Sequence, residues 1–328
     1  MKVTSADVAR EANVSRATVS YVLNDTPHQK IPEPTRQRVL DAARRLGYTP
    51  SAAARTLRRG RSDVVLLILP TWPIGHVVGE MIEVTTNELA RHGLTLVTHQ
   101  LPTGKRSFSS LWRTVSPAAV VLADTTHTEE HAAIRDAGIP VSFALLDDSP
   151  GREGALTSAQ VQIGRMQVEH LVAAGHSVIG YASPDDARLD SFALPRLEGV
   201  RIACEERVLE PPEVRTIALS SVQATAIAAW RNRRDPVTAV CAYNDEVALA
   251  VLAAAREAGV QVPDDLAVIG VDDIPVAKFA QPPLTTIKIG QRAMAEHIAA
   301  SVVCALEGKQ PPPYAGTESK VTVVRSSA

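Results

Sequence analysis

The chain has 328 residues, of which 45% are hydrophobic and 21% are charged, a balance typical of folded globular proteins. Its length predicts two or three folded units rather than one. No continuous apolar run reaches the roughly 18 residues of a membrane helix. The first residues also lack the apolar segment of a signal peptide, so we expect a cytoplasmic protein that does not bind membranes.

Basic residues are concentrated at the start of the chain. Residues 1–62 hold 12 Lys and Arg against 5 Asp and Glu, a net charge of +7. The remaining residues hold 22 against 31, a net charge of -9. A solvated basic face would give the same excess, but its concentration in about a fifth of the chain favours nucleic acid as the partner.

The cysteines and histidines show no pattern of a metal site or a disulfide framework. Cys204, Cys241 and Cys304 are odd in number, widely spaced and set in apolar segments, which is typical of reduced thiols in a core. The nine histidines form no HExxH or CxxC-type cluster. We therefore expect neither a metal nor a cofactor.

Three short helices are predicted before residue 48. The first begins after Thr4, a favourable N-cap, and ends near residue 12, and the second begins after Ser15. The third begins between residues 32 and 35 and ends at Gly47, a favourable C-terminal signal. Because a short turn joins the first two helices, the pattern predicts an all-α helix-turn-helix domain.

A basic segment, "YTPSAAARTLRRGRSD", covers residues 48–63. Pro50 and Ser51 can start a helix that Gly60 ends, which leaves about eight residues, too few for a stable helix in water. We expect this hinge to become ordered only when another surface docks against it.

From residue 64 onward, short apolar runs alternate with amphipathic stretches. This alternation predicts parallel sheets with helices on both faces, and about 265 residues predict two such lobes with a cleft between them. The fold class is therefore a helix-turn-helix domain followed by a two-lobed α/β domain with two doubly wound parallel sheets. The expected strands are "VVLLIL" (64–69), "TLVTHQL" (95–101), "AAVVLA" (118–123), "SVIGYA" (177–182), "TAVCAY" (238–243) and "LAVIGV" (266–271).

These patterns give the expected domain boundaries. The late segment from about residue 289 is expected to return to both lobes and to link them. The boundaries are 1–48 for the helix-turn-helix domain, 49–62 for the hinge, and 63–328 for the two-lobed domain, divided into one lobe of 63–160 with 289–317 and another of 161–288 with 318–328.

The second predicted helix has side chains suited to reading DNA. Val19, Val22 and Leu23 turn inward, which leaves the opposite side outward. Arg16 can donate to guanine O6 and N7, and Ala17 can contact a thymine methyl. Hydroxyl groups near the helix starts suit phosphate oxygens. Taken singly, each of these side chains could equally be an ordinary solvent-facing residue.

The segment "VTSADVAREANVSRATVSYVLND", residues 3–25, resembles the N-terminal signature of the lactose/galactose repressor (LacI/GalR) family. The resemblance implies a bacterial transcriptional repressor that binds a near-palindromic operator as a homodimer. It places Arg16, Ala17 and Tyr21 at base-reading positions. Tyr21 stands where arginine is most frequent, and Pro32 replaces the usual serine cap of the third helix. The expected DNA contacts are Thr4, Ser15, Arg16, Ala17, Thr18, Ser20, Tyr21, Asn24, Ala54, Leu57 and Arg58.

The hinge is also similar to that of the family, whose pattern is Pro-x-Ala-x-Ala-Arg-x-Leu. Here "PSAAARTL", residues 50–57, supplies the matching residues. The resemblance implies that the paired hinges enter the minor groove and that Leu57 wedges a central base step. A small core contact is the other interpretation of Leu57, but the arginines at 58, 59 and 61 leave little core for it to join.

Polar residues follow several of the predicted strands. Ligands of open α/β sheets bind beyond the carboxyl ends of the strands, so Trp72, Asn244, Asp245, Asp272 and Asp273 are expected around one cleft. Carboxylates and an amide suit a neutral hydroxylated ligand, on which the Trp72 ring could stack. Three structural alternatives remain: Asp245 as the N-cap of the following helix, Asp273 in a turn, and Trp72 as packing.

The family resemblance extends over the large domain. "YNDEVALAVLAAAREAGVQVPDDLAVIGVDDIPVAKFAQPPLTTIK" (243–288) and "PRLEG" (195–199) resemble its ligand-domain segments and place Asn244, Asp272 and Arg196 at effector positions. The resemblance implies a small-molecule effector, by default a sugar. "TWPIGHV" replaces a Ser-Asn-Pro-Phe-Phe type loop, Ala159 and Gln160 replace Asp-Asn, and the alignment of Asp147 is uncertain. The expected effector contacts are Trp72, Ile74, Arg196, Asn244 and Asp272.

Three other functions fit parts of the sequence. A solute-binding protein would share the large domain but not the basic start, and it would need an export signal. A nucleotide-using enzyme would need a GxGxxG, P-loop or GxSxG motif, and none is present, although His76 and His99 lie among scattered acids. A DNA-binding architectural protein with a ligandless domain also remains. We expect a regulator and no enzyme activity.

Overall fold

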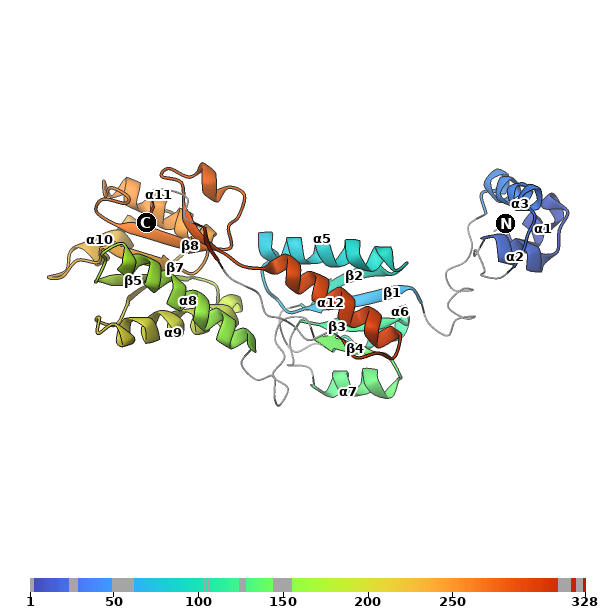
Figure 1. Cartoon of the computed structure of the whole chain (residues 1–328), viewed down its shortest axis with the longest axis horizontal. Helices are drawn as coiled ribbons and strands as arrows, with labels where there is room; N and C mark the ends of the chain where they lie inside the picture. The colour runs from blue at the N-terminus through green and yellow to red at the C-terminus, as the bar shows by residue number, and fades with distance from the viewer. Residues whose placement is uncertain are drawn as a thin grey trace. The chain divides into compact units, whose positions relative to one another are not determined.

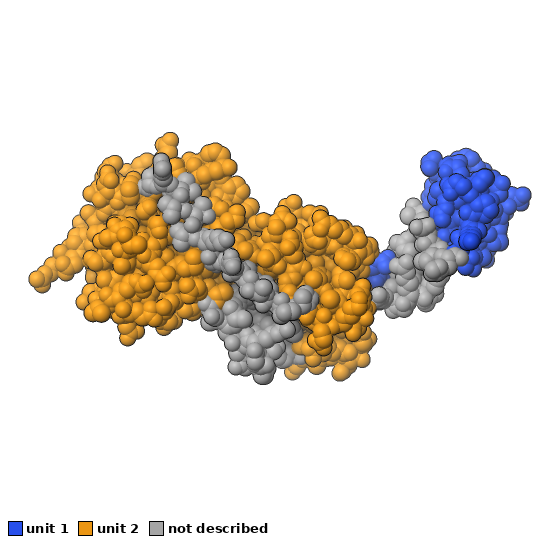
Figure 2. All heavy atoms as spheres, viewed as in Figure 1, with its two compact units in different colours: residues 1–63 blue, residues 64–328 orange. Residues whose placement is uncertain are grey.

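In a computed structural model, the chain forms two compact units, residues 1–63 and 64–328 (Figures 1 and 2). It describes residues 3–23, 29–48, 62–102, 104, 107–123, 128–143, 155–311, 320–322 and 327–328. Asn24 and Asp147 lie outside these ranges, as do residues 49–61 of the expected hinge, which include Ala54, Leu57 and Arg58.

The described residues of the first unit form three helices, α1 (Ser5–Ala12), α2 (Arg16–Leu23) and α3 (Glu33–Leu46). They pack around a core formed mainly by small and β-branched side chains, because the helices are short and approach closely. The fully buried members include Val8, Val19, Val39 and Ala42. The predicted helix-turn-helix is confirmed.

Local hydrogen bonds set the limits of these helices. The backbone N–H of Thr4, the N-cap of α1, donates to Oδ2 of Asp7 at 2.9 Å. Oγ of Ser15 accepts from the backbone N–H of Thr18 at 3.0 Å, as an N-cap of α2 does. At the end of α3, Gly47 adopts a φ of 63°, where a residue without Cβ meets no steric penalty.

The first lobe of the second unit is a parallel four-stranded sheet in the order β2-β1-β3-β4. Helices cover both of its faces (Figure 1). Its elements are β1 (Val64–Leu69), α5 (His76–Arg91), β2 (Thr95–Gln100), α6 (Ser109–Val115), β3 (Ala119–Leu122), α7 (Thr128–Asp136), β4 (Val141–Phe143) and α12 (Gln291–Leu306).

Alternation along β1 explains this arrangement. Val65, Leu67 and Leu69 join the core under α5 and α12, whereas Leu66 and Ile68 join the core under α6 and α7. Successive side chains of a strand point to opposite faces, so a continuously apolar strand is stable only when both faces are covered.

The second lobe is a six-stranded sheet in the order β10-β9-β8-β7-β5-β6. All described neighbours pair in parallel except β10 and β9, which are antiparallel. Its elements are α8 (Ala155–Ala173), β5 (Ile179–Pro184), a 3-10 turn (Ala187–Leu189), α9 (Asp190–Glu206), β6 (Glu213–Ile217), α10 (Ala224–Arg231), β7 (Ala239–Ala242), α11 (Asp245–Glu257), β8 (Ala267–Val271), a second 3-10 turn (Ala277–Phe279), β9 (Thr285–Lys288) and β10 (Lys320–Thr322).

The chain crosses between the lobes more than once. After β9 it returns to the first lobe as α12 and then supplies β10 to the second sheet. Helix α8 is continuous from Ala155 to Ala173, so the dividing point expected at residue 160 falls inside it. Five of the six expected strands contain an observed strand, and the sixth, 177–182, overlaps β5 (Ile179–Pro184). Within the described residues no helix is long and apolar enough to cross a bilayer.

Two glycines bring α8 and α9 into close contact. A Cβ on Gly164 would overlap the carbonyl oxygen of Arg196, and a Cβ on Gly199 would overlap that of Val161. The two helix backbones therefore approach to a distance that only glycine permits at these positions. This approach fixes the part of α9 that carries Arg196.

The start of α11 differs from one expectation. The N-cap is Asn244, whose Oδ1 accepts from the backbone N–H of Val247 at 2.9 Å, so the interpretation of Asp245 as the N-cap was wrong. Asp245 is fully buried and instead accepts from the backbone N–H of Ile274 at 2.9 Å and from the hydroxyl of Thr286. Its carboxylate therefore joins α11 to the segments around β8 and β9.

Replacement of Gly199 tests the close approach of the two helices. Gly199→Ala should lower the free energy of unfolding by roughly 1–3 kcal/mol, because an added methyl forces the backbones apart. Gly79→Ala is the matched control, since a Cβ at Gly79 in α5 meets nothing within 4 Å and alanine favours helix. Urea unfolding measures both variants, and equal stability of the two would contradict the packing described.

Asp245 predicts a pH dependence of stability. Burial raises the pKa of its carboxyl from 3.8 to about 7, against the opposing effect of its hydrogen bonds to Thr286 and Ile274. Between these two values the folded chain holds a proton that the unfolded chain has lost, so the group's contribution to stability falls as pH rises from about 4 to 7. Asp245→Asn removes this titration.

The stability of the wild type minus that of Asp245→Asn should therefore be smaller at pH 8 than at pH 5, by on the order of 1 kcal/mol or more. Titrations that the two proteins share cancel in this difference. Urea unfolding at the two pH values measures it, and a difference that does not change with pH would show that Asp245 titrates normally.

Candidate functional site

Helix α2 presents one side to solvent. Ser15, Arg16 and Ala17 are exposed, whereas Val19 and Val22 are buried against the other two helices. Farther along the same helix, Thr18, Ser20 and Tyr21 are half-buried. The start of α2 is therefore the part of this helix that a DNA groove could reach most directly.

Two hydroxyl groups predicted to contact phosphates also cap helices. Oγ of Ser15 lies 2.9 Å from Oγ1 of Thr18, and Oγ1 of Thr4 donates to Oδ2 of Asp7 at 2.6 Å. The bond from Thr4 lowers the pKa of Asp7 below its usual value. A hydroxyl has a single hydrogen, so Thr4 can accept another bond while it donates to Asp7, but it would have to release Asp7 to donate to a phosphate oxygen.

The sheet orders identify where a ligand cleft would form. In the first sheet the order reverses between β1 and β3, and in the second between β5 and β7, and such points lie beside the carboxyl ends of the strands. Trp72 follows β1, Asn244 follows β7 and Asp272 follows β8. Both sheets thus carry predicted effector residues at the appropriate ends.

Arg196 is the central charged group of the second lobe. It is only 4% exposed, and its Nε donates to Oε1 of Gln160 at 2.5 Å, while Nη1 donates to the backbone oxygen of Tyr243 at 2.6 Å. The guanidinium also lies over the Tyr243 ring, 4.8 Å from its centroid. Two N–H donors of Arg196 are therefore occupied by partners within the protein, and a ligand that used either donor would have to replace that partner.

Asp272 faces the remaining side of Arg196. Its Oδ1 lies 3.9 Å from Nη2 of Arg196 and, within the described part of the chain, accepts no hydrogen bond although it is buried. Burial raises the pKa of this carboxyl to about 6, against the opposing effect of Arg196. The backbone of Asp272 has a φ of 108°, which is rare for a residue other than glycine. An ionised acceptor without a donor is the group best suited to a ligand hydroxyl or N–H.

Trp72 and Ile74 have different environments. Trp72 is 6% exposed and belongs to the core of the first lobe, where its ring meets Phe192 edge to face with 4.9 Å between centroids. Ile74 is 53% exposed. Trp72 is thus a packing residue in this structure, as the alternative interpretation predicted. Ile74, by contrast, has surface that a ligand could contact.

Sequence reasoning missed three residues of this region. Gln160 holds Arg196, Tyr243 supplies both a carbonyl oxygen and a ring to it, and Phe192 meets Trp72. Gln160 was noted only as a departure from the usual Asp-Asn. That departure was the available signal, because a neutral amide can accept from arginine without cancelling its charge.

Metal chemistry finds no support in the described residues, where no group of three or more His, Cys, Asp or Glu could hold an ion. Cys204 and Cys241 are buried, and burial raises the pKa of both thiols. Nε2 of His76 lies 4.0 Å from Oε2 of Glu80, one turn later on α5, and both side chains are partly exposed.

Comparison with protein families identifies two regions. The profile of bacterial regulatory proteins of the lacI family matches residues 4–51, and that of the periplasmic binding protein-like domain matches residues 168–328. The transcriptional regulator DegA of Bacillus subtilis (strain 168) is 30% identical over 297 residues, which cover 88% of this chain and 86% of DegA. The regulator GalR of Salmonella typhimurium (strain SL1344) is 30% identical, with 98% of this chain and 94% of GalR covered.

Solved structures share the fold over the whole chain. The lac repressor dimer bound to operator and the anti-inducer ONPF superposes with a TM-score of 0.75 at 23% identity, and covers 100% of this chain and 99% of its own. A LacI-family regulator from Silicibacter pomeroyi gives a TM-score of 0.78 at 23% identity, with 99% of each chain covered. With its helix-turn-helix, its two α/β lobes and these full-length relatives, the chain belongs to the lacI family of bacterial regulatory proteins.

Proposed function

We propose that this protein is a transcriptional repressor that binds a near-palindromic operator as a homodimer and is controlled by a small molecule in the cleft between its lobes. The observation that carries the DNA-binding part is the exposed start of α2, with Ser15, Arg16 and Ala17 outward above a packed core. The protein acts in the cytoplasm, where its DNA lies, and catalysis is not part of its role.

Base reading is assigned to the exposed side of α2. Arg16 is placed to donate to a guanine, and Ala17 is placed to contact a thymine methyl. Tyr21, which stands where arginine is most frequent in the family, makes the preferred operator sequence of this protein differ from those of its relatives. Thr4, Ser15, Thr18 and Ser20 contact phosphates and fix the register. Asn24, Ala54, Leu57 and Arg58 contribute further contacts, with Leu57 as a wedge in the minor groove.

Selection of binding sites from random DNA tests this assignment. The wild type should select one near-palindromic site, and Arg16→Ala should weaken binding to that site roughly 10- to 100-fold, because a bidentate contact to guanine is worth about 1–3 kcal/mol. Arg10→Ala is the matched control, since Arg10 lies on the exposed side of α1, where it pairs with Asp7 at 3.3 Å. Failure to select any site, or equal losses in both variants, would contradict the proposal.

The effector is proposed to be a neutral hydroxylated molecule such as a sugar. Asp272 offers a buried oxygen without a donor, with Arg196 and Asn244 beside the same strand ends. The CelR regulator, which shares this fold, was solved as a complex with cellobiose, with a TM-score of 0.60 at 24% identity. Ile74, which is 53% exposed, supplies the apolar side of the site.

One observation favours a second candidate, a DNA-binding protein whose large domain binds no ligand. Arg196 is engaged by Gln160 and Tyr243, Oδ1 of Asn244 caps α11, and Trp72 is packed in a core. Several groups expected to contact an effector are therefore already occupied by the protein itself. Asp272 is the exception on which the effector proposal depends.

A thermal-shift screen with sugars, nucleosides and small acids separates the two candidates. A ligand at 100 times its Kd stabilises the native state by about 2.7 kcal/mol, which raises Tm by about 5 °C or more in a domain of this size. Asp272→Asn should abolish the shift, whereas the exposed Asp264→Asn should retain it. Absence of a shift with every compound would favour the ligandless protein.

A further inference from the structure

Phe192 joins the hydrophobic cores of the two lobes. Among the described residues it alone packs against both the large core of the second lobe and the α5/α12 core of the first. It lies in the first turn of α9, and its ring meets the Trp72 ring at an interplanar angle of 65°, a favourable edge-to-face geometry. An aromatic pair therefore connects lobes that are otherwise built around separate sheets.

The Trp72 side of this contact is held rigidly. Pro70 and Pro73 flank the segment and restrict its backbone, and the backbone oxygen of Trp72 accepts from Nε2 of Gln100 at 2.5 Å. The indole is nearly excluded from solvent. The ring thus belongs to a fixed part of the first lobe rather than to a free loop.

A polar contact lies next to the aromatic one. Nη1 of Arg188 donates to the backbone oxygen of Thr71 at 3.4 Å across the lobes. Asp186 fixes this guanidinium, because its Oδ1 accepts from Nε at 2.8 Å and its Oδ2 from Nη2 at 2.6 Å. A bidentate pair of this kind holds the arginine in one orientation.

A carboxylate of the second lobe lies near the start of α5. Its N-cap is Gly75, which supplies no side-chain cap, and a Cβ at this position would lie 3.9 Å from Oε1 of Glu246. Glu246 belongs to the first turn of α11 in the other lobe. A carboxylate near an uncapped helix N-terminus interacts favourably with the helix dipole.

We propose that the Trp72–Phe192 and Thr71–Arg188 contacts, together with the approach of Glu246 to the start of α5 at Gly75, form an inter-lobe latch that holds the lobes together before any effector binds. The latch shares its elements with the effector site. Phe192 precedes Arg196 by one helical turn on α9, and Glu246 follows Asn244 at the start of α11.

The regulatory consequence rests on the proposed effector-controlled function. In this protein an effector does not close an open cleft, because the latch already holds the lobes together in the absence of effector. It acts by changing the latch, through displacement of α9 or α11 when it binds beside Arg196 or Asn244. Phe192 and Trp72 are then positioning residues, which act through the lobe arrangement.

Pulsed electron paramagnetic resonance on the full chain tests closure without DNA or effector. Spin labels at Arg91→Cys and Glu205→Cys, both exposed and on different lobes, report the separation in a Cys304→Ser background, while Cys204 and Cys241 are buried. Labelled chain is diluted with unlabelled chain. The parent should give one narrow distance population, and Phe192→Ala should broaden it and add a longer population.

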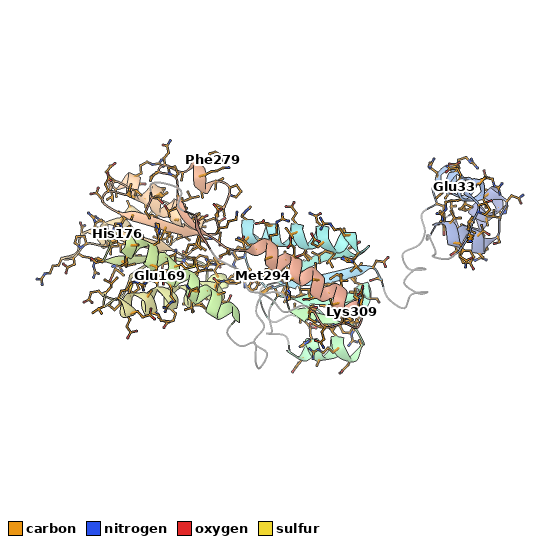
Figure 3. All side chains as sticks on the ribbon, in the orientation of Figure 1. Glu33, Glu169, His176, Phe279, Met294 and Lys309 are labelled. Atoms are coloured by element: carbon orange, nitrogen blue, oxygen red, sulfur yellow. The ribbon has the colours of Figure 1, made fainter. Side chains whose placement is uncertain are left out.

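Phe279→Ala is the matched control, because this ring is 75% exposed and lies away from the junction of the lobes (Figure 3). Arg188→Ala provides a second test that leaves both cores intact, with Arg201→Ala, an exposed arginine of α9 paired with Glu198, as its control. Arg188→Ala should also lengthen the distances. The double variant Trp72→Ala/Phe192→Ala should open the lobes no further than either single variant.

A broad distribution in the parent, or no change in both Phe192→Ala and Arg188→Ala, would overturn the latch. Circular dichroism melting confirms that each variant is folded, and if Phe192→Ala is not, Arg188→Ala decides the result. The measurement contains neither operator nor effector. Failure of the latch therefore leaves the operator selection unaffected, and failure of the selection leaves these distances unaffected.

Discussion

The close approach of α8 and α9 is the constraint on which the ligand lobe depends. Because Gly164 and Gly199 carry no side chains, the two backbones meet, and Gln160 on α8 is brought against Arg196 on α9. A guanidinium so deeply buried is tolerable only when its donors are satisfied, since water cannot replace a lost partner there. The helix contact and the charged site are therefore one structural unit, and a change in helix spacing would disturb both.

Local features of the DNA-binding unit could be predicted from the sequence. The helical period alone places Val19 and Val22 inward and Arg16 outward, and Ser15 caps the helix through a bond to a residue only three positions later. Such features depend on neighbours within one or two turns. The positions of the strands followed in the same way from runs of apolar residues between turns.

Features that depend on distant segments could not be predicted. Asn244 and Asp245 are adjacent and chemically similar, and which of them caps α11 is decided by Thr286 and Ile274, which meet Asp245 only in the folded sheet. The role of Phe192 likewise depends on a segment of another lobe, more than a hundred residues earlier in the chain. Sequence patterns identify where polar groups gather. Only the fold shows which of these groups are bonded within the protein and which remain available to a ligand.

The polar groups that are already bonded within the protein contribute little to the binding of an effector. Arg196 already donates to Gln160 and Tyr243, so a ligand that merely replaces one of these bonds exchanges one donor–acceptor pair for another and gains little. Asp272 lacks such a donor, so a contact there adds a bond that the free protein does not have. Only a ligand whose contacts differ between two lobe arrangements can shift their populations, and by no more than that difference in free energy. Phe192 and Arg196 share one helix, so a ligand that reaches Asp272 by displacing α9 would also strain the aromatic contact between the lobes, and this displacement would couple the site to the arrangement of the lobes.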